Sequence, residues 1–171
     1  MWSKQLAAAL AATLALAGSA NADSTLADRI QSGDRKAALA MIAAGADVNQ
    51  AQPDGTTPLH WAAYRVDREL VLTLLKKGAK ADAVNKYGAS PLAEAVRVAN
   101  IDLVGMILEA GANANVANED GQTALMLAAR TGDVAVARLL VERGADVNRR
   151  EHFKDQSAVI CGCAYQLLRT G

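Results

Sequence analysis

The stretch 118-NEDGQTALMLAARTGDVAVARLLVERGADVN-148 contains the signals that decide the fold. Asp120-Gly121 is a tight-turn dipeptide, because glycine adopts a positive φ without a clash from a Cβ atom. Thr123 follows as a helix N-cap candidate, since its hydroxyl can accept a hydrogen bond from a free backbone N–H of the first turn. The small and apolar side chains of residues 124–130 then predict a short helix.

A second helix follows a break at residues 131–133. Residues 134–143 place apolar side chains at helical spacing and turn charged side chains to the opposite side. Gly144 ends this helix as a residue in the left-handed region. Neither helix is long enough to be stable alone in water, so the unit must stack on other copies of itself.

Copies of this unit recur along the chain at a constant interval. The helix-ending glycines have this spacing, and each is followed by alanine: Gly45, Gly78, Gly111 and Gly144. The turn glycines Gly55, Gly88 and Gly121 repeat at the same period. A fixed period of this length is the signature of a solenoid of stacked repeats.

The repeated segments resemble the ankyrin repeat family. The residues that carry the resemblance are DGTTPLHWAA (54–63), YGASPLAEAV (87–96), DGQTALMLAA (120–129) and GADVN at both 45–49 and 144–148. The resemblance implies an all-α, helix-turn-helix solenoid with repeats at 23–52, 53–85, 86–118 and 119–151. Residues 152–171 are expected to be an incomplete or truncated fifth repeat, in which Gln156-Ser157 echoes Gln122-Thr123 with one residue inserted.

The N-terminal segment, 1–22, is expected to lie outside the fold. Lys4 precedes an apolar run at 6–17, and Ala20-Asn21-Ala22 is a small-x-small cleavage pattern. This pattern predicts that residues 1–22 are a cleaved signal peptide of the kind found in exported bacterial proteins. The mature protein is therefore expected to be periplasmic or secreted. A retained anchor or a buried N-terminal helix is the alternative.

Composition argues against several function classes. A net charge of +0 and a pI near 6.7 give no basic surface for nucleic acid or anionic lipid. The sequence has no glycine-rich phosphate loop and no Ser/His/Asp set at a recognisable spacing. We therefore expect no enzyme activity, no cofactor and no metal. The turn carboxylates Asp47, Asp54, Asp120 and Asp146 are interpreted as hydrogen-bonding groups of the loops.

The two cysteines stand together near the C-terminus. Cys161 and Cys163 have a spacing that is not typical of zinc sites, and no second pair completes four ligands. They are interpreted as having no function, although a disulfide within or between chains stays open. The segment around them is apolar where a terminal repeat needs a polar face, so truncation or a changed reading frame is expected, with possible self-association through that fragment.

The second repeat carries the fullest family motif, Thr57-Pro58-Leu59-His60. Pro58 suits the first turn of a helix, where its missing N–H costs nothing. The resemblance implies that His60 hydrogen-bonds backbone and the threonine hydroxyl to hold successive turns together. Val66 stands where the break between helices usually carries glycine, as does Ala99 in the next repeat, so the backbone at Val66 must differ or be strained.

The resemblance also implies where a partner would bind. Ankyrin proteins use the turn tips and the exposed positions of each first helix, which face a concave groove. In this chain the corresponding candidates are Trp61, Tyr64, Arg65, Lys86, Tyr87, Glu94, Arg97, Gln122 and Arg130. Tyrosine, tryptophan and arginine dominate binding hot spots. For Trp61, packing between neighbouring first helices is the alternative.

The function expected from the sequence is a non-catalytic protein–protein interaction module. It would bind a protein partner through the preformed groove, so little ordering entropy is lost on binding. The alternative is an inhibitor or immunity-type protein that blocks a secreted or periplasmic enzyme with the same surface.

Overall fold

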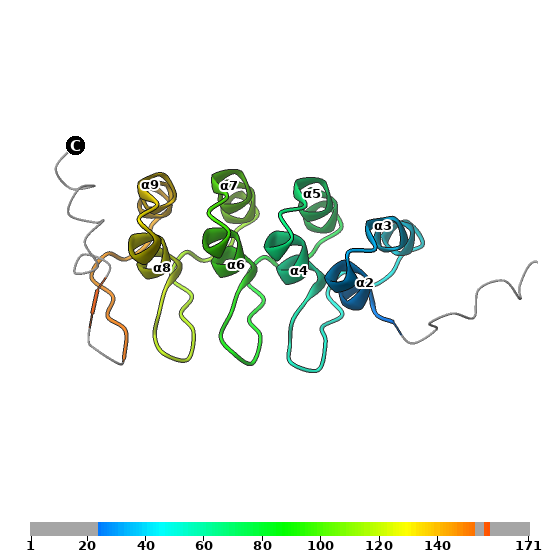
Figure 1. The fold of residues 1–171 in the computed structure, drawn as a ribbon, viewed down its shortest axis with the longest axis horizontal. Coiled ribbons are helices and arrows are strands. Elements are labelled where there is room, and N and C mark those ends of the chain that lie inside the picture. Colours follow the sequence, from blue (N-terminus) through cyan, green and yellow to red (C-terminus); the bar gives the residue numbers. More distant parts are fainter. Residues whose placement is uncertain (1–23, 153–155, 158–171) are drawn as a thin grey trace, which may run out of the picture.

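The computed structural model describes residues 24–152 and 156–157, and eight α-helices lie within them. The helices are α2 (Leu26–Ser32), α3 (Arg35–Ala43), α4 (Pro58–Tyr64), α5 (Arg68–Lys76), α6 (Pro91–Arg97), α7 (Ile101–Glu109), α8 (Ala124–Thr131) and α9 (Val134–Glu142). They form four consecutive helix pairs that stand in a row in sequence order (Figure 1). The predicted all-α solenoid is confirmed.

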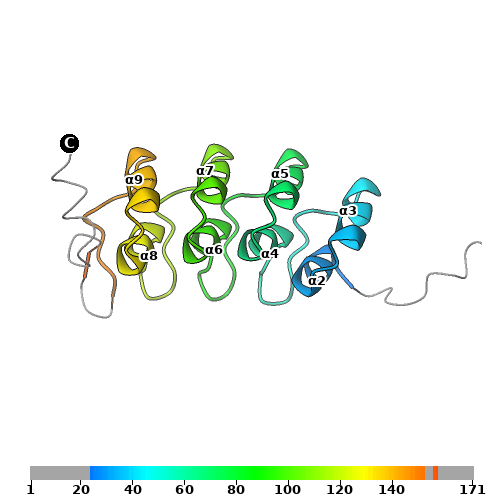
Figure 2. The same cartoon turned by 45° about the horizontal axis from the view of Figure 1, so that its top comes forward.

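The first and second helices of the pairs form two separate layers. Helices α2, α4, α6 and α8 make one layer, and α3, α5, α7 and α9 make the other (Figure 2). The loops that join successive pairs all project on the side of the first helices (Figure 1). Neighbouring first helices contact each other more extensively than neighbouring second helices do. One face of the stack is therefore built from first helices and loop tips.

The helices begin at side chains that cap them. The Thr123 hydroxyl accepts from the Met126 N–H at 3.4 Å, as the sequence predicts. Each second helix begins after a carboxylate or amide that accepts from the N–H of the helix's first turn, namely Asp34, Asp67, Asn100 and Asp133. Local chemistry thus fixes the start of every second helix.

The break between the two helices of a pair uses one left-handed residue in each repeat. Glycine supplies it in the outer repeats, with φ of 83° at Gly33 and 78° at Gly132. In the middle repeats Val66 (φ 59°) and Ala99 (φ 52°) adopt the same region. Of the two alternatives for Val66, a different backbone or strain, the structure shows the second: the turn keeps the left-handed conformation, which is disfavoured for a β-branched side chain.

The core is a continuous column that crosses repeat boundaries. Leu59, Leu92 and Leu125 occupy equivalent places in the first helices and are fully or almost fully buried. On the second helices, Leu74 is fully buried, whereas Leu75 is only partly buried against the core. No helix pair encloses these side chains by itself, so each repeat depends on its neighbours.

A ladder of side chain to backbone hydrogen bonds joins the loops that follow the second helices. Asn49 donates to the Gly78 carbonyl at 3.0 Å and accepts from the Lys80 N–H at 2.8 Å. Asn115 repeats this pair of bonds with the Gly144 carbonyl and the Asp146 N–H. Asp82, at the same place in the repeat between them, accepts from the Asn113 N–H at 2.6 Å but has no proton to donate.

The turn after the fourth repeat follows the pattern of the others with one extra residue. The Glu151 N–H donates to the Gln156 carbonyl at 3.0 Å, and the His152 N–H donates to the Asp120 carbonyl at 2.7 Å. The predicted signal peptide, Cys161, Cys163 and the rest of the expected partial repeat lie outside the described residues. None of the described helices has the length and apolar character needed to cross a membrane.

Candidate functional site

Two of the loop tips are held by an asparagine side chain at their base. Asn85 accepts from the N–H groups of Tyr87 and Ala89 at 3.0 and 2.9 Å. Asn118 accepts in the same way from Asp120 and Gln122 at 3.1 and 2.8 Å. With the loop fixed from below, Tyr87 stands at the tip with 68% of the residue exposed.

His60 joins the second repeat to the third. Its Nδ1 accepts from the Thr57 N–H at 3.1 Å and lies 2.8 Å from the Thr57 hydroxyl, while Nε2 donates to the Ala89 carbonyl at 3.0 Å. Burial lowers the pKa of His60. These are the hydrogen bonds that the family motif implies, and they use both ring nitrogens of the neutral imidazole. In the third repeat, Ala93 takes the place of the histidine, so this link is not repeated there.

Gln52 and Trp61 fill the space between the first two repeats. The Gln52 amide donates to Asp28 at 2.6 Å and to Gln31 at 2.8 Å, and its oxygen accepts from Trp61 Nε1 at 2.7 Å. The Trp61 ring meets Tyr64 edge to face, with centroids 5.9 Å apart. Trp61 is therefore half-buried and fixed in place, and the open part of this face begins at Tyr64.

A first hollow of about 300 Å³ lies between α4 and α6. Its walls include Trp61, Tyr64, Tyr87, Glu94 and Arg97. Tyr64 is 49% exposed. Aromatic surface thus forms one side of this hollow, and a charged pair forms the other.

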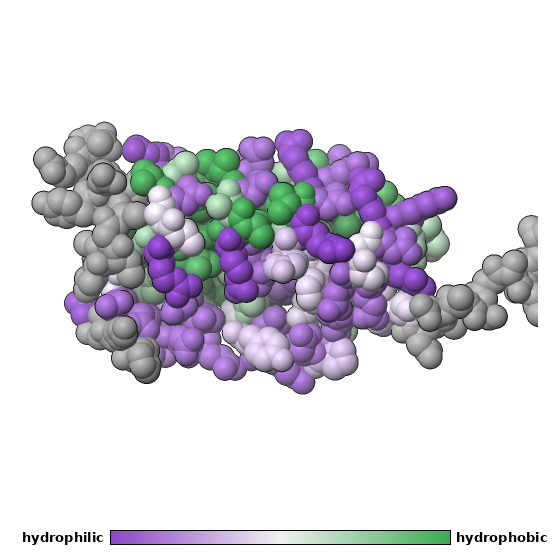
Figure 3. Space-filling model, in the orientation of Figure 1, coloured by the Kyte–Doolittle hydropathy of each residue, from purple (hydrophilic) through white to green (hydrophobic). Residues whose placement is uncertain are grey.

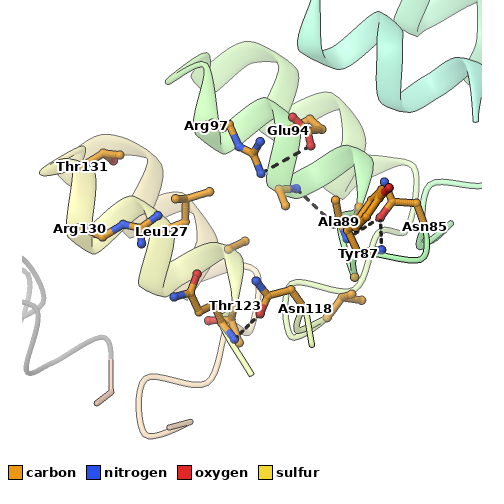
Figure 4. A pocket seen from close by; sticks show the side chains of 16 residues that line it. Asn85, Tyr87, Ala89, Glu94, Arg97, Asn118, Thr123, Leu127, Arg130 and Thr131 are labelled. Carbon is orange, nitrogen blue, oxygen red and sulfur yellow. Dashed lines mark hydrogen bonds and ion pairs between the residues drawn. The ribbon is translucent and has the colours of Figure 1, made fainter. Parts of the chain in front are cut away.

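A second hollow of about 490 Å³ lies between α6 and α8. Its walls include Glu94, Arg97, Gln122, Leu127, Arg130 and Thr131. Figure 4 shows the Arg97 and Arg130 side chains extending from α6 and α8 into the space between the two helices. The two hollows share Asn85, Tyr87, Glu94 and Arg97, and together they are called the groove.

Glu94 and Arg97 form the ridge between the two hollows. Arg97 Nη2 lies 3.7 Å from Glu94 Oε1, and the side chains are 56% and 12% exposed, respectively. Burial raises the pKa of Glu94, and the Arg97 charge opposes that rise. A contact this long, with one exposed partner, contributes little to stability and leaves the Arg97 guanidinium accessible.

The structure brings most of the predicted partner-binding residues together. Trp61, Tyr64, Tyr87, Glu94, Arg97, Gln122 and Arg130 all line the groove. Arg65 and Lys86 do not line it. The Arg65 guanidinium lies over the turn at Gly33, where it would overlap an added Cβ atom. Lys86 is exposed on its loop, and its backbone N–H donates to the Asp54 carbonyl.

Sequence reasoning missed the amide side chains that shape the groove. Asn85 and Asn118 line it, and Gln52 accepts a hydrogen bond from Trp61, which lines its first hollow. The sequence does contain a signal for these residues. The three amides recur with the period of the turn glycines, at the base of three successive turns. Hydrophobic periodicity does not detect such residues, since their partners lie in loops.

The turn carboxylates serve the loops, as expected for three of the four. Asp47, Asp54 and Asp146 each accept from the N–H two residues later. Asp120 instead takes part through its backbone, which donates to Asn118 and accepts from His152. Among residues 24–152, 156 and 157, no group of three or more histidine, cysteine, aspartate or glutamate side chains is placed to hold a metal ion.

Figure 3 shows the face of the molecule that is seen in Figure 1: apolar residues gather over the region of α6 to α9, and hydrophilic residues cover the loops.

Family models match most of the chain. A model for three copies of the ankyrin repeat matches residues 26–118, and a single ankyrin repeat matches residues 120–152. No curated protein is significantly similar to the chain. Ankyrin repeats are protein–protein interaction modules. The stacked helix pairs, the left-handed turns and these matches agree, and the chain belongs to the ankyrin repeat family.

Proposed function

We propose that the chain is a non-catalytic module that binds a protein partner in the groove. The observation that carries this proposal is the set of large side chains in the groove that the stack does not use. Tyr64 and Tyr87 are 49% and 68% exposed, and Arg97 and Arg130 are exposed beside them. Exposed tyrosine and arginine over a rigid surface are the residue types that dominate protein interfaces.

The dimensions and construction of the groove favour a protein over a small molecule. The groove follows the first helices from α4 to α8, and loop tips form its other border. Its length suits an extended segment or the edge of a folded partner. Because caps and asparagine hydrogen bonds fix the lining elements, the groove is preformed, and binding loses little conformational entropy.

The groups best suited to catalysis beside the groove, His60, Thr56 and Thr57, already have structural partners, which supports a non-catalytic role. His60 uses both ring nitrogens in the link between repeats. Two threonine hydroxyls lie beside a base, Thr56 on the Asp54 carboxylate and Thr57 on the His60 ring. Both threonines are only 6% exposed, so neither hydroxyl is open to a substrate in the way that nucleophilic catalysis requires.

The proposed module works outside the cytoplasm. This part of the proposal rests on the charged start, apolar run and cleavage pattern of residues 1–22. N-terminal sequencing of the protein recovered from the producing cells should give a chain that starts at Asp23. A chain that still starts at Met1 would contradict cleavage.

Site-directed photocrosslinking tests the groove directly. A photoreactive amino acid at Tyr87, in the loop tip, should crosslink one dominant protein in the cells that produce the chain. The same amino acid at Lys77, which is exposed at the end of α5, is the control and should not crosslink that protein. Equal crosslinking from both positions, or from neither, would overturn the proposal. The partner's own activity with and without the chain then separates an adaptor from an inhibitor.

A further inference from the structure

The second hollow has an excess of positive charge. Arg97 and Arg130 occupy equivalent places of successive repeats, on α6 and α8, and both lean into the same hollow (Figure 4). The Arg97 guanidinium lies 3.7 Å from Glu94, and Arg130 has no ion pair within the part of the chain that the structure describes. Two accessible guanidinium groups in adjacent repeats form a site that favours carboxylates.

Glu94 does not cancel this charge at the surface. Its side chain is only 12% exposed, whereas that of Arg97 is 56% exposed. Burial raises the pKa of Glu94, so desolvation works against its negative charge. An approaching ligand therefore meets the two arginines first.

The neighbouring hollow shares Glu94 and Arg97 with the second hollow and adds aromatic surface to them. Tyr64 and Tyr87 line it and are both exposed, and Trp61 packs against Tyr64. The groove thus changes along its length from an aromatic section between α4 and α6 to a cationic section between α6 and α8.

We propose that the groove binds an extended, acidic segment of the partner protein. Two of its carboxylates pair with Arg97 and Arg130, and an apolar or aromatic side chain lies between Tyr64 and Tyr87. Packed helices are about 8–10 Å apart and an extended chain rises about 3.3 Å per residue, so carboxylates about three residues apart reach both arginines. This inference rests on the proposed function, because it assumes that the groove is the binding surface.

Selection from a displayed library of random dodecapeptides, with the full chain as bait, tests the segment chemistry. The expected result is enrichment of aspartate or glutamate at two positions with the spacing that reaches both arginines, next to an aromatic or large apolar residue. Enrichment of basic or uncharged peptides, or no enrichment, would overturn the proposal.

Charge-reversal variants then locate the carboxylates. Binding of the best selected peptide should weaken about tenfold or more in Arg97→Glu and in Arg130→Glu, and it should fall with added salt. Arg68→Glu is the matched control, because Arg68 is exposed on α5, and it should leave the affinity unchanged. Circular dichroism spectra establish that the variants are folded. Equal affinity in all three variants would contradict the assignment.

The two proposals fail in different ways. If the groove crosslinks a partner but the library selects no acidic peptide, the inference about segment chemistry is wrong and the proposed function stands. If position 87 gives no groove-specific crosslink, the proposed function itself is wrong.

Discussion

His60 shows how one side chain can join two repeats. Its Nδ1 accepts from the Thr57 N–H and its Nε2 donates to the Ala89 carbonyl in the next loop. A proton added to Nδ1 would face a donor instead of an acceptor, and the ring is largely buried. Both effects favour the neutral imidazole in the folded chain, so His60 links protonation to stability.

The stability of the chain should therefore depend on pH through His60. Its pKa in the folded state lies below the ordinary value of 6.5, so the unfolded state binds the proton first. The contribution of His60 to stability is fully present above the pKa that this residue has in the unfolded chain. It is lost as the pH falls below that value toward the lower pKa of the folded state. Urea unfolding at pH 7.5 and pH 5.5 should show a larger loss for the wild type than for His60→Gln. An equal loss in both proteins would show that His60 does not contribute.

Asp82 is the one departure from the asparagine ladder between the described repeats. Asn49 and Asn115 each donate to a glycine carbonyl of the next repeat, and Asp82 cannot. Asp82→Asn should add a donor facing Gly111 while it keeps the bond from the Asn113 N–H. We expect a gain of about 0.5–1.5 kcal/mol in the free energy of unfolding, measured by urea denaturation, which is the usual net worth of one such bond. Reduced stability would mean that the charge of Asp82 matters more.

At the scale of the elements, the turn between α4 and α5 keeps a valine in a conformation that favours glycine. Val66 has a φ of 59° and is 44% exposed, so its side chain gains little from burial. The left-handed region costs a non-glycine residue about 1–2 kcal/mol. A glycine variant would remove this cost, but the greater freedom of glycine in the unfolded chain would offset part of that gain.

Val66→Gly should raise the free energy of unfolding by about 1 kcal/mol. Gly132→Val places valine at the equivalent turn of the fourth repeat and should lower it. Thermal unfolding of the two variants beside the wild type measures both changes. A destabilised Val66→Gly variant would show that the contacts of the valine side chain stabilise the fold by more than the backbone strain costs.

The elements could be predicted from sequence because their signals are local. Thr123, Gly132 and Gly144 mark a cap, a break and a helix end within a few residues of the backbone they control. The sequence pattern leaves the packing of Trp61 open, because its hydrogen-bond partner Gln52 belongs to a loop whose shape the pattern does not reveal. For the same reason, the sequence does not predict that the Arg65 side chain lies over Gly33 of the previous repeat. Contacts between repeats depend on how far each side chain reaches, and periodicity does not encode that.

At the scale of the whole molecule, the side chains that stabilise the stack differ from those that we propose to bind the partner. The buried leucine columns and the loop ladder hold the repeats together, while Tyr64, Tyr87, Arg97 and Arg130 line the groove without a core role. Substitutions in the groove should therefore alter binding with little effect on folding. The resemblance to ankyrin repeats implies that these side chains lie in the groove, whereas the division of the groove into aromatic and cationic sections required the structure.

The most direct test of the central claim is the affinity of the Tyr64→Ala/Arg97→Ala double variant for the partner identified by crosslinking, with Arg68→Ala/Lys77→Ala as the control. Loss of two hot-spot side chains should weaken binding by about 2 kcal/mol or more, roughly thirtyfold, with the thermal unfolding of the stack nearly unchanged. The control, altered only at exposed positions of α5 and its end, should bind like the wild type. Wild-type affinity in the folded double variant would contradict the claim that the groove is the binding surface.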